Sequence, residues 1–181
     1  MIIGITGPAG AGKDTVADYL VQAHDFRKLS WASPLKAMLA AAGLPEPANR
    51  DDKEKQIPGF DFSWRQAAQR LGTEWGRGLD ADIWIKMVGQ ILREQPHVEW
   101  VISDCRFENE TALIRSLGGQ ILHLEGRSVD LGAAAGHASE AGLTQLPEDW
   151  LLYNNGTISE MYSEVGIVLL GMRRQKIVGS R

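Results

Sequence analysis

A glycine-rich run near the start of the chain has the residue types and spacing of a phosphate-binding loop, G-x-x-x-x-G-K. It consists of Gly7, Pro8, Ala9, Gly10, Ala11, Gly12 and Lys13. Glycines let several backbone N–H groups point into one concavity, and the helix expected from about Asp14 adds the positive end of its dipole. Lys13 supplies a full charge that can reach the terminal phosphates of a nucleotide. An ordinary glycine-rich turn is the alternative, but strand, loop, lysine and helix coincide here.

The position after the lysine departs from this pattern. A serine or threonine that ligates magnesium normally stands there, whereas this chain has Asp14, followed by Thr15. A carboxylate beside a triphosphate is repelled unless a cation or hydrogen-bond donors lie between them. We therefore expect Asp14 to help hold Mg²⁺ through water, and Thr15 to offer its hydroxyl to the α- or β-phosphate. Alternatively, Asp14 points outward and only complements the helix N-terminus.

A second group of polar residues follows a predicted buried strand over residues 98–103. Asp104 stands at the carboxyl end of that strand, where open α/β sheets bind their ligands, and is a candidate magnesium ligand. Arg106 can pair with a phosphate from the same crevice. In the alternative, Asp104 caps the next helix and Arg106 neutralises nearby acids. Glu108 and Glu110 suit the acidic first turn of that helix.

A third candidate site lies in the middle of the chain. Arg65 and Gln69 share one helix face, and Arg70 lies about 100° around the helix from Gln69. Such a row can hold a monophosphate and a base edge, although on these residues alone a solvated helix face is the favoured interpretation. Gly72 is expected to end the helix, so that Thr73 and Glu74 line a polar corner after it.

Two segments are predicted to be mobile loops. Residues 43–62 contain three prolines and a charge run, and residues 125–142 are rich in Gly, Ala and Ser. The later segment carries Arg127, His137 and Glu140, and an arginine on such a loop suits a lid that closes over a transferring phosphoryl group. A lone histidine is more often structural or simply exposed.

The alternation of predicted strands and helices along the chain predicts an α/β domain around a mainly parallel sheet. Expected strands cover residues 2–6, 26–29, 98–103, 120–124 and 150–153. Expected helices cover residues 14–24, 34–42, 63–71, 80–94 and 109–117, with a last one from about 159.

Composition narrows the classes of function. The 181 residues suit one domain, and 19 basic against 23 acidic residues give a net charge of −4, which argues against a polyanion binder. The one cysteine excludes an internal disulfide and favours a reducing compartment. Neither a signal-like start nor an 18-residue apolar run is present, so we expect a cytoplasmic protein with no membrane partner.

Together these stretches resemble the bacteriophage deoxynucleoside monophosphate kinase family. The resemblance runs through nearly the whole chain in consistent order. Besides the glycine-rich run with Asp14 and Thr15, it rests on segments 32–36, 65–74, 83–84, 103–110, 137–143 and 154–157.

The resemblance implies a three-layer P-loop NTPase fold, a single kinase domain over 1–181, with an acceptor-binding insertion at 43–79 and a lid at 125–142. It implies transfer of the ATP γ-phosphoryl group to a deoxynucleoside 5′-monophosphate, dependence on Mg²⁺, and often a homodimer; if the chain is phage-encoded, it works in the host cytoplasm. On this basis the substrate-binding candidates are Lys36, Arg65, Gln69, Arg70, Thr73, Glu108, His137 and Glu140, and the catalytic candidates are Lys13, Arg106 and Arg127.

Two other functions stay open. One is another small-molecule kinase of the same architecture, acting on dephospho-coenzyme A or phosphomevalonate. The other is a nucleotide-dependent switch with little turnover, although the four arginines at positions 65, 70, 106 and 127 favour a phosphotransferase.

Overall fold

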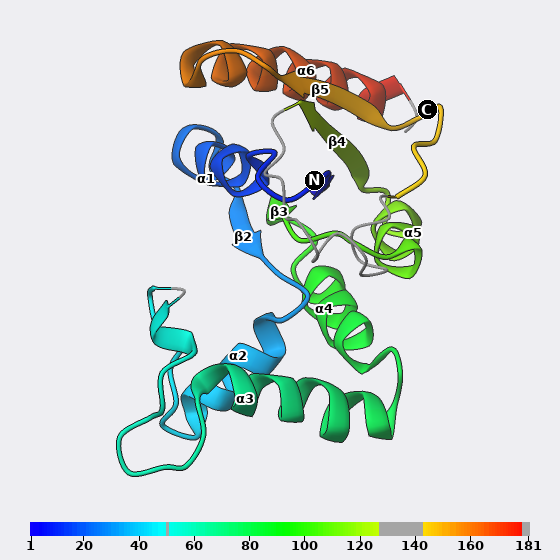
Figure 1. Cartoon of the computed structure of the whole chain (residues 1–181). Coiled ribbons are helices and arrows are strands. Elements are labelled where there is room, and N and C mark those ends of the chain that lie inside the picture. Colours follow the sequence, from blue (N-terminus) through cyan, green and yellow to red (C-terminus); the bar gives the residue numbers. More distant parts are fainter. Residues whose placement is uncertain (50, 127–142, 179–181) are drawn as a thin grey trace. The chain divides into compact units, whose positions relative to one another are not determined.

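The structure is a computed structural model that describes residues 1–49, 51–126 and 143–178. The chain forms two compact units (Figure 1). One unit combines Met1–Leu29 with Gln95–Arg181, and the other is Ser30–Glu94. Within the described residues, no helix has the length and apolar character needed to cross a membrane.

The first unit is built on a five-stranded sheet in the order β2-β3-β1-β4-β5, and every neighbouring pair is parallel. Its strands are β1 (Ile2–Thr6), β2 (Arg27–Leu29), β3 (Trp100–Ile102), β4 (Gln120–Gly126) and β5 (Trp150–Asn154). The predicted α/β class with a parallel sheet is therefore confirmed. Because the strands are parallel, the segments that follow β1, β3 and β4 all leave from the same edge of the sheet.

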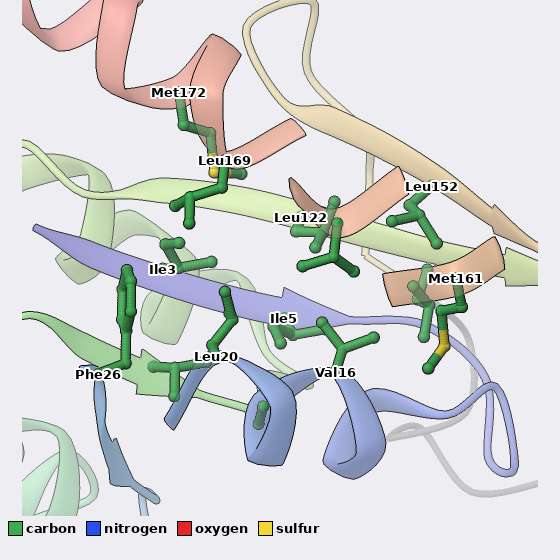
Figure 2. Packing of buried hydrophobic residues seen from close by; sticks show 14 of the residues in the cluster. Ile3, Ile5, Val16, Leu20, Phe26, Leu122, Leu152, Met161, Leu169 and Met172 are labelled. Atoms are coloured by element: carbon green, nitrogen blue, oxygen red, sulfur yellow. The ribbon is translucent and has the colours of Figure 1, made fainter. Parts of the chain in front are cut away.

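Helices cover both faces of this sheet. They are α1 (Lys13–His24), α5 (Glu108–Ser116) and α6 (Ile158–Val178). Figure 2 shows side chains of α1 and α6, among them Val16, Leu20 and Leu169, packed against Ile3 and Ile5 of β1. On the other face, a Cβ at Gly4 would meet Ile114 of α5. The unit thus has three layers, as the resemblance to the kinase family implied.

The second unit is helical. It contains α2 (Ser33–Ala41), the short 3₁₀ helix η1 (Asp51–Lys53), α3 (Trp64–Gln69), the π-helical segment η2 (Arg70–Arg77) and α4 (Ile83–Glu94). Its core consists of Leu35, Leu39, Trp64 and Trp84. Both indoles donate to backbone carbonyls, Trp64 to Leu44 at 3.1 Å and Trp84 to Gly72 at 2.9 Å. These tryptophans are therefore core residues with satisfied N–H groups.

The predicted helix end at Gly72 is wrong. Ser63 does cap α3, because its Oγ accepts the Gln66 N–H and Gln66 accepts the Ser63 N–H. The chain then continues through Gly72 as η2 instead of forming a polar corner. A Cβ at Gly72 would lie 2.8 Å from Leu35, so glycine serves close packing there rather than chain termination.

Gly76→Ala is expected to destabilise the second unit by about 1–3 kcal/mol, the usual cost of overpacking. The new Cβ would lie 2.8 Å from Cε2 of Trp84 and closer still to Cζ2. Gly78→Ala is the matched control, because a Cβ there meets nothing within 4 Å. Urea unfolding measures both variants, and equal stability of the two would contradict the close contact between η2 and α4.

Candidate functional site

The glycine-rich run forms the connection between β1 and α1. Gly7, Gly10 and Gly12 have φ values of 141°, 80° and 98°, a region that residues with a Cβ rarely adopt. A Cβ at Gly7 would also collide with the backbone of Leu124 on β4. Lys13 begins α1, and its Nζ donates to the carbonyls of Gly7 at 2.7 Å and Pro8 at 2.8 Å. The predicted loop is therefore present with its lysine folded over it.

A side chain from the end of β5 supports this loop. The Nδ2 of Asn154 donates to the carbonyl of Ala11 at 2.8 Å, and Asn154 is buried. A Cβ at Gly12 would lie 2.8 Å from the same Nδ2. The sequence suggested no role for Asn154, because the contact joins residues 143 positions apart.

Asp14 lies at the start of α1 and is held by two donors. The Ser103 hydroxyl and the Lys28 ammonium contact its Oδ1 at 2.8 and 2.9 Å. Burial raises the pKa of the Asp14 carboxyl, but these hydrogen bonds and the charges of Lys28 and Lys13 outweigh it and hold that pKa below its usual value. Asp14 is therefore ionised at neutral pH, as a group that serves a cation must be.

The end of β3 meets the start of α1 through Ser103, so Asp104 and Asp14 come from adjoining segments. The N–H groups of Arg106 and Phe107, just before α5, are accepted by Glu110 at 2.7 and 3.1 Å. Glu110, in the first turn of α5, thus holds the segment that enters the helix. Glu108 accepts the Thr144 N–H at 3.1 Å.

A cavity of about 190 Å³ adjoins the loop within the first unit. It brings together two of the predicted catalytic residues, Lys13 and Arg106. Its other lining residues are Thr6, Gly7, Pro8, Ala9, Cys105, His123, Leu124, Glu125 and Leu143. The cavity thus joins backbone of a phosphate-binding loop with two cationic side chains, a combination suited to an anionic ligand.

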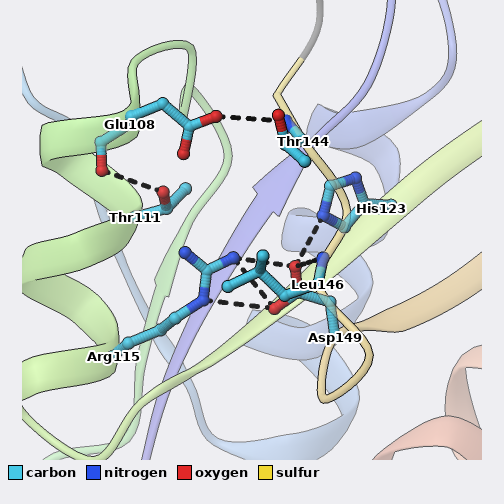
Figure 3. A network of polar contacts seen from close by, with 7 residues as sticks. All are labelled: Glu108, Thr111, Arg115, His123, Thr144, Leu146 and Asp149. Carbon is cyan, nitrogen blue, oxygen red and sulfur yellow. Dashed lines mark hydrogen bonds and ion pairs between the residues drawn. The ribbon is translucent and has the colours of Figure 1, made fainter.

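One wall of this cavity belongs to a charge network that the sequence did not suggest (Figure 3). Nε2 of His123, on β4, lies 3.0 Å from Oδ2 of Asp149. Arg115 on α5 contacts both oxygens of the same carboxylate, at 3.0 and 2.7 Å, and the Leu146 N–H donates to it at 2.9 Å. The residues come from three separate segments, so no local pattern marks them.

In the second unit, the cationic residues predicted to bind the phosphoryl acceptor lie next to carboxylates. Arg65 forms an ion pair with Glu54, and Lys36 lies 3.0 Å from Glu46. Arg70 lies 3.9 Å from Glu74 one turn on, and both side chains are more than 70% exposed. Gln69 and Thr73 are exposed as well.

Three predicted site residues, Arg127, His137 and Glu140, lie outside the residues that the structure describes. In the described part of the chain, three or more carboxylate, histidine or cysteine side chains nowhere gather as a metal cluster. A pair of carboxylates still suits Mg²⁺, which usually takes one or two protein carboxylates and completes its shell with phosphate oxygens and water.

Comparisons with known proteins identify the family of this chain. Residues 46–165 match the model of the deoxynucleotide monophosphate kinase family. A protein of Acanthamoeba polyphaga mimivirus, named "Putative deoxynucleotide monophosphate kinase", is 31% identical over 91% of this chain and 94% of its own.

Solved structures show the same fold. The shikimate kinase of Aquifex aeolicus matches with a TM-score of 0.51 at 14% identity, over 94% of this chain and 97% of its own. The Thermus thermophilus protein TT1252 matches with a TM-score of 0.54 at 20% identity, over the same shares. The fold is therefore the three-layer P-loop kinase fold. From the family match and the mimivirus relative, the chain belongs to the deoxynucleotide monophosphate kinase family and is a nucleotide kinase, a phosphotransferase that uses ATP.

Proposed function

We propose that the chain transfers the γ-phosphoryl group of ATP to a deoxynucleoside 5′-monophosphate, giving the diphosphate and ADP. The observation that carries this proposal is the cavity beside the glycine-rich loop, which Lys13 and Arg106 both line. Phosphoryl transfer depends on positioning and on donors aimed at the charge of the transferring group. Lys13 reaches the terminal phosphates from α1, and Arg106 approaches the same group from the end of β3.

Asp14 and Asp104 are the residues proposed to hold Mg²⁺, partly through water. Mg²⁺ held by these carboxylates would balance the negative charge of the phosphates. The donors on Asp14 support the proposal, since Ser103 and Lys28 fix its carboxylate in the ionised form. Thr15 offers its hydroxyl to the phosphates. Backbone N–H groups come from the non-proline residues of the loop, namely Gly7, Ala9, Gly10, Ala11 and Gly12.

Residues 43–79 are proposed as the acceptor-binding insertion. The cations Lys36, Arg65 and Arg70 hold the acceptor phosphate, with Gln69 and Thr73 beside the nucleoside. Ion pairs with Glu46 and Glu54 keep the first two cations ordered, and an incoming phosphate can replace a carboxylate as their partner.

The lid assignment for residues 125–142 stays part of the proposal and rests on the sequence. Arg127 would contact the transferring phosphoryl group, and His137, Glu140 and Glu108 would contact the substrate. The homodimer rests on the resemblance to the family, and a cytoplasmic site of action rests on the reducing compartment that the one cysteine favours.

The direct test is a coupled assay of ADP release with ATP and Mg²⁺ across the deoxy- and ribonucleoside monophosphates. Dephospho-coenzyme A and phosphomevalonate complete the panel. We expect turnover with at least one deoxynucleoside monophosphate and a higher kcat/KM than for its ribose counterpart. Turnover with only the other two acceptors would identify a different small-molecule kinase, and ATP binding without turnover on any acceptor would identify a switch.

Arg65→Ala is expected to raise the KM for the monophosphate by about tenfold, because a charge-assisted hydrogen bond to phosphate is lost. The KM for ATP should stay within about twofold, since that nucleotide is bound by the glycine-rich loop. Steady-state kinetics on both substrates measures the split. Arg93→Ala, an exposed arginine on α4, is the control. Equal small effects on both KM values would mean that Arg65 belongs to a solvated helix face.

Asp14→Asn is expected to raise the Mg²⁺ concentration for half-maximal activity by about tenfold, the scale typical of lost outer-sphere support. The amide keeps the shape of the side chain and can still accept from Ser103, so the change isolates the charge. Asp18→Asn is the matched control, because Asp18 lies one turn later on α1 and contacts the same Lys28 at 2.9 Å. An unchanged magnesium curve for Asp14→Asn would leave Asp14 as a helix-start residue.

A further inference from the structure

A buried histidine lines the cavity and has no part in the function proposed above. His123 of β4 is the register partner of Thr6 at the end of β1, and both residues line the cavity with Lys13. The His123 side chain is only 9% exposed. Asp149, which contacts its Nε2, does not line the cavity, so Nδ1 is the ring nitrogen left available to a ligand there. Figure 3 shows that second nitrogen turned away from Asp149.

Asp149 fixes which ring nitrogen carries a proton. Burial raises the pKa of its carboxyl, but hydrogen bonds from Arg115, Leu146 and His123 outweigh burial and hold that pKa below its usual value. An ionised carboxylate only accepts hydrogen bonds, so Nε2 of His123 is the donor. The neutral ring therefore presents a lone pair at Nδ1, and the protonated ring presents a second N–H there.

We propose that His123 binds the γ-phosphoryl group of ATP as an imidazolium, with Nδ1–H donating to a phosphoryl oxygen. This inference rests on the proposed function, because it takes ATP as the nucleotide in the loop. Lys13 is the residue that reaches the terminal phosphates, and it contacts the carbonyls of Gly7 and Pro8. These two residues and Ala9 form the part of the glycine-rich run that lines the cavity. A lone pair at Nδ1 would repel a phosphoryl oxygen, whereas an N–H attracts it.

Proton uptake follows from this contact. Because only the protonated ring donates from Nδ1, ATP binding should be accompanied by proton uptake, and ATP affinity should fall as the pH rises. The other titratable and charged groups around the ring come from every neighbouring element of this unit. They are Asp149, Arg115, Lys13, Arg106, Glu125 and Cys105. Of these, Asp149 at contact distance and Glu125 attract a cationic ring, whereas Arg115, Lys13 and Arg106 repel it.

Two substitutions separate the ring nitrogens. In His123→Gln the amide N–H stands where Nε2 stood, which keeps a donor for Asp149 and removes Nδ1. In His123→Asn the amide nitrogen takes the place of Nδ1, which keeps a neutral donor toward the cavity and loses the contact with Asp149. His97→Gln is the control, because His97 is exposed in the loop before β3.

The experiment is calorimetric titration of the full chain with a β,γ-methylene analogue of ATP and with ADP, each with Mg²⁺, in two buffers of different ionisation enthalpy. We expect His123→Gln to weaken the ATP analogue by about tenfold and ADP by less than about twofold, and to abolish proton uptake. His123→Asn should recover part of the affinity without proton uptake, and His97→Gln should match the unchanged protein.

Equal weakening of both nucleotides by His123→Gln, or proton uptake that survives it, would overturn the role of His123 and leave the proposed function standing. Failure of the unchanged chain to bind either nucleotide would overturn the proposed function itself. A kinase that binds ATP through His123 but phosphorylates no deoxynucleoside monophosphate would contradict only the proposed acceptor.

Discussion

Lys13→Met is expected to lower kcat by about 10²–10³-fold, the loss typical when one preorganised donor to a charged transition state is removed. Lys13 is the charged member of the loop and lies on the cavity wall. Folding should be little affected, because the loop carbonyls to which its Nζ donates are partly buried or exposed. Single-turnover and steady-state rates measure the effect, and thermal unfolding checks the fold.

Lys86→Met is the matched control for this change. Lys86 is 65% exposed, lies on α4 and forms an ion pair with Asp80 on the surface of the second unit. Its loss should leave kcat within about twofold, since surface ion pairs contribute little. A Lys13→Met protein that kept more than about a tenth of kcat, a barrier change below about 1.4 kcal/mol, would show that Lys13 does not serve the transferring group.

The sequence predicted the parts of the site that depend on local spacing. The turn from Gly7 to Lys13 could be predicted from its own residues, because three of its glycines can adopt the positive φ values that the turn needs before α1 begins. Asp104 and Arg106 were placed at the same sheet edge because parallel strands deliver their carboxyl ends together. The cavity that contains both Lys13 and Arg106 agrees with that reasoning.

Contacts between distant segments could not be predicted in the same way. His123 stands between two leucines on β4, which fits the pattern of a buried strand. No neighbouring residue in the sequence indicates that Asp149 is its partner. The contact of Asn154 with Ala11 has the same origin.

The wrong helix end at Gly72 has a different cause. Glycine suits a helix end as well as a close contact, and the sequence alone did not show that Gly72 and Gly76 face Leu35 and Trp84.

Arg115→Met is expected to lower the free energy of unfolding at pH 7 by about 3–5 kcal/mol, because it leaves a buried carboxylate without its cation. The side chain of Asp149 is only 2% exposed. Arg173→Met is the matched control, since Arg173 contacts Glu99 at the same 2.7 Å but both side chains are 32–45% exposed. That surface pair should contribute less than about 1 kcal/mol. Urea unfolding measures both.

The dependence of this loss on pH distinguishes an orphaned charge from lost packing. The pKa of Asp149 is lower in the folded than in the unfolded chain, so its ion pair stabilises the fold above the unfolded pKa of about 4 and the stabilisation is lost as the pH falls through the folded value. The gap between Arg115→Met and the unchanged chain should therefore narrow below about pH 4. At pH 7, adding Asp149→Asn to Arg115→Met should recover part of the loss, because it removes the unpaired charge. A gap that is the same at every pH, with no recovery in the double variant, would mean that Arg115 stabilises the fold through the packing of its alkyl chain instead of through Asp149.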